Sequence, residues 1–493
     1  MVPDVSEERH ELQAPSEGAT EDLVITHHEI TVGGATLTYT AAAGFLTVRE
    51  EAGITGPNPP SAANIFVTAY TVPVPANAPS RPVIFAYNGG PGATSMWLHL
   101  GLFGPRRVVA TEGTRPVGPP YRLVDNEETA LMFADVVVLD LVNTGYSRME
   151  AGEPTDAYHG VARDVDLTAE TIRLWVTRNK RWNSPILLAG ESYGVLRTAK
   201  VADRLISRHG LYPAGLVLIS SPFGPDSMDF QPGAILAYPA FLPSYAAVAH
   251  YHGHRADRSL EDVVREAEAF AAHDYVPVLQ AGNRLDGAER AAAAERLAQI
   301  TGLSPDYLMR SRLRITNDRF FAELLRSRGQ IIGRNDGRFI GWNADTVGEL
   351  AHSDPSYDVI RGAFASAMNH YARTELSYIN DLPYEVTTAR ARPWQTEPHA
   401  GFTAVDSLGV ALRKNPQMLV NYSLGYYDLC TPYWGALSDL AQVDIPPELL
   451  DNIEVQRYAS GHMIYLDDAA RGAMAQNLKA FVERVLGRGR GPP

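Results

Sequence analysis

Three residues whose side chains together can cleave acyl bonds occur in this chain, and each follows a run of apolar residues. Ser192 is the centre of Gly190-Glu191-Ser192-Tyr193-Gly194, directly after the apolar run 185–189. The flanking glycines permit the sharp strand-to-helix turn that exposes a serine hydroxyl as a nucleophile. The pentapeptide alone is only moderately specific, because ordinary turns also contain glycine and serine. Its interpretation therefore depends on what else the chain offers.

An acid and a histidine follow the serine along the chain. Asp428 comes after the apolar run 417–422, and His462 lies in a loop after the run 453–458. Both runs are typical of buried strands. We expect His462 to act as general base toward Ser192, and Asp428 to orient the imidazole and support its cation. A Gly-His pair in a loop is commonly a plain polar turn, so the assignment of His462 depends on chain order and strand-end placement.

A glycine-rich loop upstream of the serine offers unobstructed backbone amides. The strand-like run 82–87 leads directly into Asn88-Gly89-Gly90-Pro91-Gly92. Acyl transfer needs preorganised donors at the position where negative charge develops. The N–H groups of Gly90 and Tyr193 are our candidates for this oxyanion hole. The alternative interpretation of the loop is a tight turn that binds no ligand.

Taken together, these segments resemble the serine carboxypeptidase family, whose members are peptidases of the α/β-hydrolase fold. The resemblance covers the core of the chain, and this chain, with its single cysteine, is similar to a disulfide-free, bacterial-type member. Six blocks in family order carry it: 88–92, Gly104-Pro105, Asp140 with Gly145-Tyr146-Ser147, 190–194, 425–430 and Gly461-His462-Met463. The resemblance implies a serine-type carboxypeptidase that acts on peptides with a free C-terminus. It also implies roles for single residues: Ser192, Asp428 and His462 as triad, and Gly90 and Tyr193 as oxyanion donors.

The family also holds the free carboxylate of the substrate, and the matching residues here are Asn88 and Glu191. A carboxylate shares a hydrogen bond with Glu191 only if one of the two carries a proton, which favours mildly acidic pH. Two recognition elements are missing, because Ala86 replaces a tryptophan and Leu102 replaces a second carboxylate. Without that second acid, Glu191 loses a like-charge neighbour that would raise its pKa, and we expect the optimum to move toward neutral.

These departures leave other functions open. One alternative is a related serine esterase or acyltransferase, and another is a proline iminopeptidase-type aminopeptidase, which also uses a Gly-Gly-Pro-Gly loop. The aminopeptidase would recognise a free amino end, usually through carboxylates in its cap, whereas Asn88 with Glu191 suits a free carboxyl end. A non-catalytic binding protein on the same fold is disfavoured because all three triad members are present.

Composition agrees with a large enzyme. The 493 residues are 45% hydrophobic, enough for a large core, and the net charge of −14 argues against binding to nucleic acid. The single cysteine, Cys430, excludes an internal disulfide and indicates a reducing compartment or a disulfide-free fold. No signal peptide and no membrane-spanning run is visible, so we expect a cytoplasmic protein without membrane partners. The oligomeric state is not indicated by the sequence.

One histidine run resembles a metal site. His250, His252 and His254 alternate, but on a helix only residues three or four apart share a face, so we expect no metal there. No H-E-x-x-H sequence, P-loop or dinucleotide fingerprint is present, and we expect no cofactor.

The apolar pattern predicts an α/β-hydrolase fold with a mostly parallel central sheet and an inserted helical cap. The predicted parts are a disordered acidic tail over 1–22, a hydrolase core over 23–221 and 394–493, and a cap over 222–393 with helices at 261–272 and 288–300. A hairpin is predicted at 24–32 and 36–40, and further helices at 161–175 and 469–486. Buried strands are predicted at about 82–87, 135–141, 185–190, 215–219, 418–423 and 453–458.

Overall fold

The computed structural model describes residues 23–49, 61–75, 78–141, 143–150, 158–388, 394 and 403–488. The predicted disordered tail, 1–22, therefore lies outside the described residues. So do most of the residues around the predicted boundary between cap and core at 393/394.

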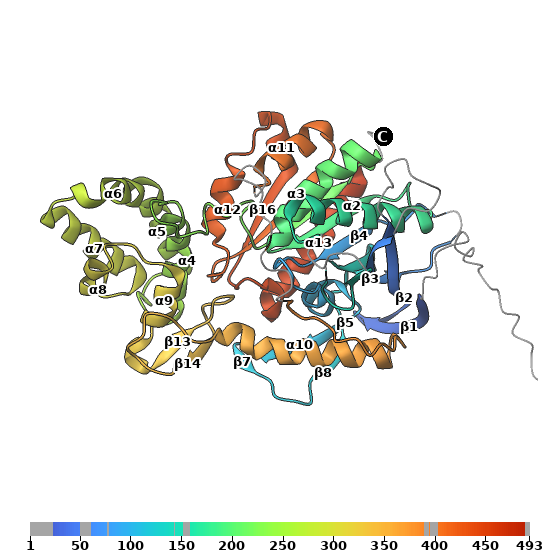
Figure 1. Ribbon diagram of the computed structural model, residues 1–493, viewed down its shortest axis with the longest axis horizontal. Helices are drawn as coiled ribbons and strands as arrows, with labels where there is room; N and C mark the ends of the chain where they lie inside the picture. The colour runs from blue at the N-terminus through green and yellow to red at the C-terminus, as the bar shows by residue number, and fades with distance from the viewer. Residues whose placement is uncertain are drawn as a thin grey trace, which may run out of the picture.

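A ten-stranded mixed sheet forms the centre of the molecule (Figure 1). Its strands lie in the order β1-β2-β3-β9-β4-β11-β12-β15-β16, with β10 paired to β3. All pairings from β9 to β16 are parallel, and those from β1 to β9 are antiparallel. The strands are β1 Val24–Val32, β2 Ala35–Arg49, β3 Ser61–Thr71, β4 Val83–Tyr87, β9 Asp135–Asp140, β10 Arg148–Met149, β11 Ile186–Glu191, β12 Gly215–Ile219, β15 Leu419–Gly425 and β16 Ile453–Tyr458.

All six predicted strands are present and mutually parallel, but β16, predicted as buried, is mostly half-buried because it lies at the edge of the sheet. Helices cover both faces of a parallel sheet, so its strands are apolar on both sides, and this is why their runs were continuous in the sequence. The predicted hairpin is also present, but its second strand, β2, extends to Arg49 instead of ending at Thr40. The extension pairs with β3, a contact between segments that local pattern does not reveal.

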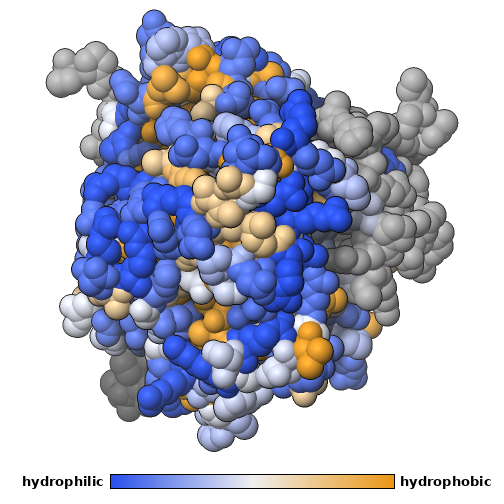
Figure 2. All heavy atoms as spheres, turned by 90° about the vertical axis from the view of Figure 1, so that its left-hand side faces the viewer, coloured by the Kyte–Doolittle hydropathy of each residue, from blue (hydrophilic) through white to orange (hydrophobic). Residues whose placement is uncertain are grey.

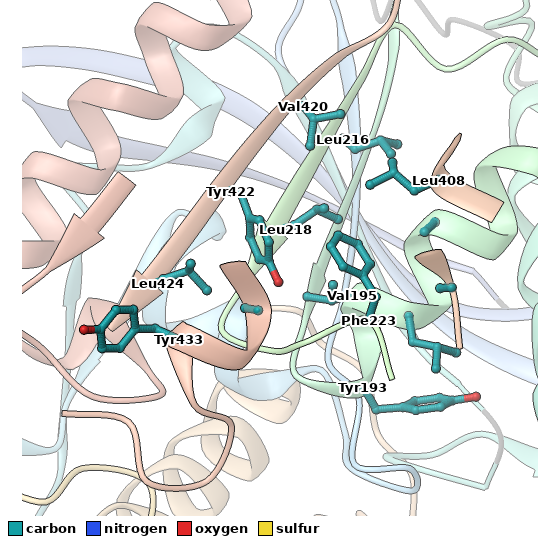
Figure 3. Packing of buried hydrophobic residues seen from close by; sticks show 14 of the residues in the cluster. Tyr193, Val195, Leu216, Leu218, Phe223, Leu408, Val420, Tyr422, Leu424 and Tyr433 are labelled. Carbon is teal, nitrogen blue, oxygen red and sulfur yellow. The ribbon is translucent and has the colours of Figure 1, made fainter. Parts of the chain in front are cut away.

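Two apolar clusters fill the two faces of the sheet. Along β4, Phe85 belongs to one cluster and its neighbours Ile84 and Ala86 belong to the other, as side-chain alternation in a strand requires. The first face is covered by α2 (Val161–Arg178), α3 (Tyr193–Arg204) and α11 (Val405–Lys414), and Figure 3 shows part of this packing. The second face is covered by α1 (Met96–Leu98) with the π-helical turn His99–Phe103, by α10 (Pro355–Thr374) and by α13 (Asp468–Arg488).

A long insertion separates β12 from β15. Most of its helices lie to one side of the sheet, at the left in Figure 1. Its elements are α4 Ala237–Tyr251, α5 Leu260–Phe270, α6 Val276–Ala281, α7 Gly287–Thr301, α8 Pro305–Arg310, α9 Asn317–Glu323, β13 Gln330–Ile332, β14 Ile340–Trp342 and α10. Helices α5 and α7 correspond to the two predicted there.

Helix α10 lies within the predicted cap range, yet its apolar side chains join the core. Phe364 packs against Trp97 with ring centroids 5.0 Å apart, and Met368 and Tyr371 are fully buried in the same cluster. The boundary between cap and core at residue 393 therefore stays a prediction. Helix α10, the last helix before that boundary, packs against the face of the sheet as part of the core.

The shorter elements complete the described chain. They are the strands β5 Arg106–Val109, β6 Thr111–Glu112, β7 Arg115–Pro116 and β8 Arg122–Asp125, and the helix α12 Tyr433–Leu440. Within the described ranges, no helix has both the length and the hydropathy needed to cross a bilayer. The end of the molecule formed by the insertion is mostly hydrophilic, with separated apolar patches (Figure 2).

Candidate active site

Ser192 occupies a strained turn between β11 and α3. Its backbone angles, φ 62° and ψ −132°, are ones that residues with a side chain rarely adopt. Ser192 is half-buried, whereas Glu191 and Tyr193 on either side are buried. A Cβ on Gly190 would lie 2.1 Å from the carbonyl oxygen of Gly194, so the turn has room only for glycine there. The predicted strand-to-helix turn is thus present, and Ser192 is more accessible than the residue on either side of it.

Asp428 and His462 come together at the carboxyl ends of β15 and β16. The His462 Nδ1 atom lies 2.8 Å from Asp428 Oδ2. Both residues are buried, Asp428 at 1% and His462 at 6% exposure. Because β11, β12, β15 and β16 are parallel, Ser192 follows its strand at the same edge of the sheet. The structure therefore places the three predicted triad members along one edge.

The Asp428 carboxylate is held by its own loop. Its Oδ1 accepts hydrogen bonds from the N–H groups of Cys430 (2.8 Å) and Thr431 (2.9 Å). The Thr431 hydroxyl donates to Oδ2 at 2.7 Å and lies 2.9 Å from His462 Nδ1. Thr431 is a member of this network that the sequence did not single out. The single cysteine contributes through its backbone, in agreement with a structural interpretation.

The charge state of His462 depends on this pairing. Burial by itself lowers the pKa of the imidazole, but the charge and hydrogen bond of Asp428 outweigh it, so the His462 pKa lies above its usual 6.5. The site is therefore arranged to stabilise an imidazolium, the form that a general base takes after accepting a proton.

The glycine-rich loop after β4 lies against the start of α3. A Cβ on Gly89 would lie only 2.5 Å from the backbone nitrogens of both Tyr193 and Gly194. Gly90 is exposed and has a φ of 105°, which favours glycine. The loop and the helix N-terminus are thus in direct contact next to Ser192. The assignment of the Gly90 and Tyr193 N–H groups as oxyanion donors stays a prediction.

Asn88 and Glu191 form a buried polar cluster with a third residue, Tyr465. The Tyr465 hydroxyl donates to Glu191 Oε2 at 2.8 Å, and the Asn88 side chain hydrogen-bonds with both partners. Asn88 Oδ1 also accepts from the N–H of Leu98 at 3.1 Å. All three side chains of the cluster belong to residues less than 5% exposed. The two predicted carboxylate-binding residues are therefore in contact.

The pKa of Glu191 is set mainly by its burial. Burial raises it to about 7, against the opposing influence of His462 and of the hydrogen bonds from Tyr465 and Asn88. The argument from the sequence considered only neighbouring charges, whereas desolvation has the largest influence on this pKa. Glu191 is therefore neutral over the acidic range and up to about pH 7.

Tyr465 lies beside the turn that contains Leu102. A Cβ on Gly101 would lie 2.3 Å from Cε2 of the Tyr465 ring, so the ring covers the π-helical turn that contains Leu102. Leu102 itself is buried and apolar, and Ala86 of β4 is buried in the apolar cluster on the second face of the sheet. Tyr465 follows His462 by only three residues, but nothing in that spacing indicated contact with Glu191.

The insertion also contacts the catalytic loops. The N–H of His462 donates to the carbonyl of Asn335 at 2.6 Å, and the N–H of Leu429 donates to the carbonyl of Arg334 at 3.1 Å. A Cβ on Gly461 would lie 2.5 Å from that same Asn335 oxygen. The segment before β14 is therefore part of the wall of the site, a contact that the sequence did not indicate.

The three alternating histidines do not converge. Their Nε2 atoms pair with three different backbone carbonyls: His250 with Arg258 (2.9 Å), His252 with Gly337 (2.7 Å) and His254 with Gln299 (2.8 Å). Each histidine is thus accounted for by a structural hydrogen bond. Among the residues that the structure describes, no group of three potential ligands is arranged to hold a metal ion.

Solved structures share this architecture. The prohormone-processing carboxypeptidase Kex1(delta)p of Saccharomyces cerevisiae is 14% identical, with a TM-score of 0.51, over 90% of this chain and 91% of the other. The chain has the α/β-hydrolase fold. At this identity the likeness is one of fold alone. No model of a protein family and no curated protein sequence matches the chain.

Other α/β-hydrolase structures are similar at lower scores. A proline iminopeptidase of Mycobacterium smegmatis is 14% identical over 90% of this chain and 99% of the other, with a TM-score of 0.37. A carboxyl esterase of Bacillus coagulans is 11% identical over 94% and 99%, with a TM-score of 0.36. These values carry no assignment of activity, so the function has to be argued from the site itself.

Proposed function

We propose that this α/β-hydrolase is a serine-type carboxypeptidase, which removes the C-terminal residue of peptides through an acyl-enzyme. The observation that carries the proposal is the position of Glu191. Its buried carboxyl, with a pKa of about 7, directly precedes the half-exposed Ser192. A neutral carboxyl next to the nucleophile can share a proton with a substrate carboxylate, and this would place the last peptide bond at the serine.

The chemical steps follow from the orientation of His462. Since Asp428 pairs with Nδ1, Nε2 is the nitrogen left to accept the Ser192 proton. The Ser192 oxygen attacks the carbonyl carbon of the last peptide bond, and His462 then gives the proton to the departing amine as the C–N bond breaks. Water attacks the acyl-enzyme and gives its proton to Nε2, which returns it to the Ser192 oxygen.

Recognition of the free carboxyl end is assigned to the cluster of Glu191, Asn88 and Tyr465. The Asn88 amide is an uncharged donor, and the Tyr465 hydroxyl, which gives its proton to Glu191, is also uncharged, so neither repels a carboxylate. Burial raises the Tyr465 pKa well above its usual range, so this hydroxyl keeps its proton at all working pH values. The cluster contains no cation. Neutral Glu191 is therefore the group on which capture of the carboxylate depends.

The proposal is tested by the release of a C-terminal amino acid from an N-blocked dipeptide between about pH 4.5 and 8. The same dipeptide with a C-terminal amide is the competing substrate. Below pH 7 we expect the free acid to be cleaved faster than the amide. The Ser192→Ala variant should cleave neither substrate. Ser207→Ala is the matched control, since its exposed hydroxyl bonds only a carbonyl of its own helical turn.

The outcome separates the remaining functions. Turnover of simple esters that depends on Ser192, without release from the free acid, would reject the carboxypeptidase and leave an esterase or acyltransferase. Cleavage that requires a free amino end would indicate the aminopeptidase. If Ser192→Ala changes no activity, the catalytic proposal itself is wrong.

A further inference from the structure

A buried ion pair lies beneath the two segments that border Ser192. Asp164 of α2 and Arg197 of α3 are 0% and 2% exposed. Their contact is bidentate, with Arg197 Nε 2.8 Å from Asp164 Oδ2 and Nη2 3.1 Å from Oδ1. Removing two charges from water costs several kcal/mol, and a well-packed apolar pair of similar volume is often at least as stable. Stability alone is therefore a weak account of this pair.

The remaining hydrogen-bonding capacity of the pair is directed at the candidate site. Arg197 Nη1 donates to the backbone carbonyl of Asn88 at 2.5 Å. The Tyr193 hydroxyl donates to Asp164 Oδ2 at 3.1 Å. The guanidinium also lies over the Tyr193 ring, 5.0 Å from its centroid. The pair thus holds both neighbours of the predicted oxyanion hole: the loop that contains Gly90, and the first residue of α3.

Each of these contacts fixes an orientation that the chemistry needs. A peptide unit is planar, so holding the carbonyl of Asn88 fixes the plane of the Asn88–Gly89 bond and the start of the loop. The Tyr193 ring extends away from the packing of β12 and β15 (Figure 3). Its anchor at Asp164 holds the residue whose N–H is the predicted oxyanion donor. An error of about 1 Å in such donors costs about 10²-fold in rate.

We propose that Arg197 is a positioning residue that, together with Asp164, sets the separation of the Gly90 loop from the Tyr193 amide and so the geometry of the oxyanion hole. This inference rests on the proposed hydrolytic function of Ser192. It does not require that the substrate be a peptide. Arg197 acts through Asn88 and Tyr193 and does not touch the reacting atoms.

The decisive variant is Arg197→Lys, which keeps the charge but cannot make the bidentate contact and reach the Asn88 carbonyl at once. The first readout is the rate at which an alkyl fluorophosphonate labels Ser192, where an oxygen–phosphorus bond forms, fluoride leaves and His462 takes the proton. We expect that rate, and kcat for a simple ester, to fall about 10- to 100-fold, because loss of one oxyanion donor costs about 10² to 10³ in kcat. The ester KM should change less than twofold.

A partly buried ion pair, with a buried carboxylate and a half-buried arginine, gives the control. Asp135, 3% exposed at its side chain, pairs with Arg181 at 2.7 Å. Asp135 begins β9, so this pair lies at the opposite end of the parallel strands from Ser192. Arg181→Lys should lower the unfolding midpoint less than Arg197→Lys, because Arg81 also pairs with Asp135, and it should leave the labelling rate within about twofold of the native rate.

A double variant keeps the test decisive if single variants fail to fold. Asp164→Leu with Arg197→Met removes both charges and leaves none unpaired. A folded double variant that labels slowly supports the positioning role. Native labelling rates in this variant, or in folded Arg197→Lys, would overturn it. A native chain that is labelled at Ser192 but releases no amino acid rejects the carboxypeptidase and leaves this inference standing, whereas no labelling at all overturns both.

Discussion

The hydroxyl of Tyr465 donates to the carboxyl of Glu191 at 2.8 Å, although 274 residues separate the two in the chain. Both are at most 2% exposed. The contact joins the loop after β16 to the residue before the nucleophile, so it links the histidine side of the site to the proposed carboxylate pocket. Burial keeps this carboxyl neutral up to about pH 7, although the hydrogen bond from Tyr465 favours its charged form.

The first prediction is a pH profile that depends on the substrate. A free-acid dipeptide needs neutral His462 and neutral Glu191, so its kcat/KM should rise through the His462 pKa and fall above about pH 7. An ester without a carboxylate needs only neutral His462 and should reach a plateau. Above pH 7 the free-acid KM should increase about tenfold per pH unit. Initial rates for the two substrates from pH 5 to about 9 measure this difference.

Glu191→Gln is the control for that profile. Its amide does not titrate, so the alkaline fall for the free acid should disappear while the ester plateau is kept. If the native alkaline fall persists in Glu191→Gln, Glu191 is not the group responsible.

The second prediction concerns Tyr465→Phe. The Tyr465 hydrogen bond lowers the Glu191 pKa, so removing it raises that pKa further and moves the alkaline fall of free-acid kcat/KM to higher pH. The plateau of ester kcat/KM should be little affected, because the Tyr465 hydroxyl bonds Glu191 and not Ser192. Tyr275→Phe removes a buried hydroxyl that donates to the Leu313 carbonyl in the insertion, and it should leave both profiles unchanged. If the alkaline fall of free-acid kcat/KM does not move in Tyr465→Phe, the effect of the Tyr465 hydrogen bond on Glu191 is contradicted.

The parts of this structure that the sequence predicted are those marked by local pattern. Ser192, Asp428 and His462 each follow a parallel strand, so strand ends and chain order located them, although β16 before His462 also contains Glu454, Gln456 and Arg457. Asn88 and Glu191 lie within short motifs. In each case the informative residues are neighbours in the chain.

The missed residues are placed by packing between distant segments. Tyr465 reaches Glu191 only because its ring covers Gly101, and Arg197 reaches Asn88 across 109 residues. Neither contact leaves a periodicity or a motif. The Glu191 pKa could not be derived from the sequence for a related reason. Its largest cause is burial, and burial of a strand-end residue follows from the packed fold and not from local sequence.

The third prediction is that Glu191 destabilises the fold at neutral pH. Its folded pKa of about 7 lies above the ordinary 4.5, so the folded state binds more protons than the unfolded state between these values. Stability therefore falls as pH rises through this window, by about 3 kcal/mol in total. Urea unfolding should show Glu191→Gln gaining about 2 to 3 kcal/mol over the native chain at pH 8 relative to pH 5. The exposed Glu483→Gln should show no such gain.

The fourth prediction is that Asp428→Asn lowers the His462 pKa. The charge and hydrogen bond of Asp428 raise that pKa, so their loss moves the acid limb of the ester profile to lower pH. The plateau kcat should fall by about 10⁴, since the amide favours the wrong imidazole tautomer. Asp439→Asn is a suitable comparison, because its carboxylate caps backbone N–H groups at Phe223, away from His462. An acid limb that moves upward would contradict the assignment of Asp428.

The fifth prediction is that Gly101→Ala acts through Tyr465. The added Cβ would lie 2.3 Å from the ring, so the ring must move and its hydroxyl must leave Glu191. At about pH 6, where Glu191 is neutral with or without this hydrogen bond, free-acid KM should rise about 5- to 10-fold because the carboxyl loses a contact that orients it, with ester kcat nearly unchanged. Because both changes break the same contact, Gly101→Ala with Tyr465→Phe should raise KM no further than Gly101→Ala alone. Gly472→Ala, in α13 with open space around its Cβ, is the matched control and should leave KM unchanged. Additive effects of the two substitutions on KM would mean that Gly101 supports the pocket by a route other than Tyr465.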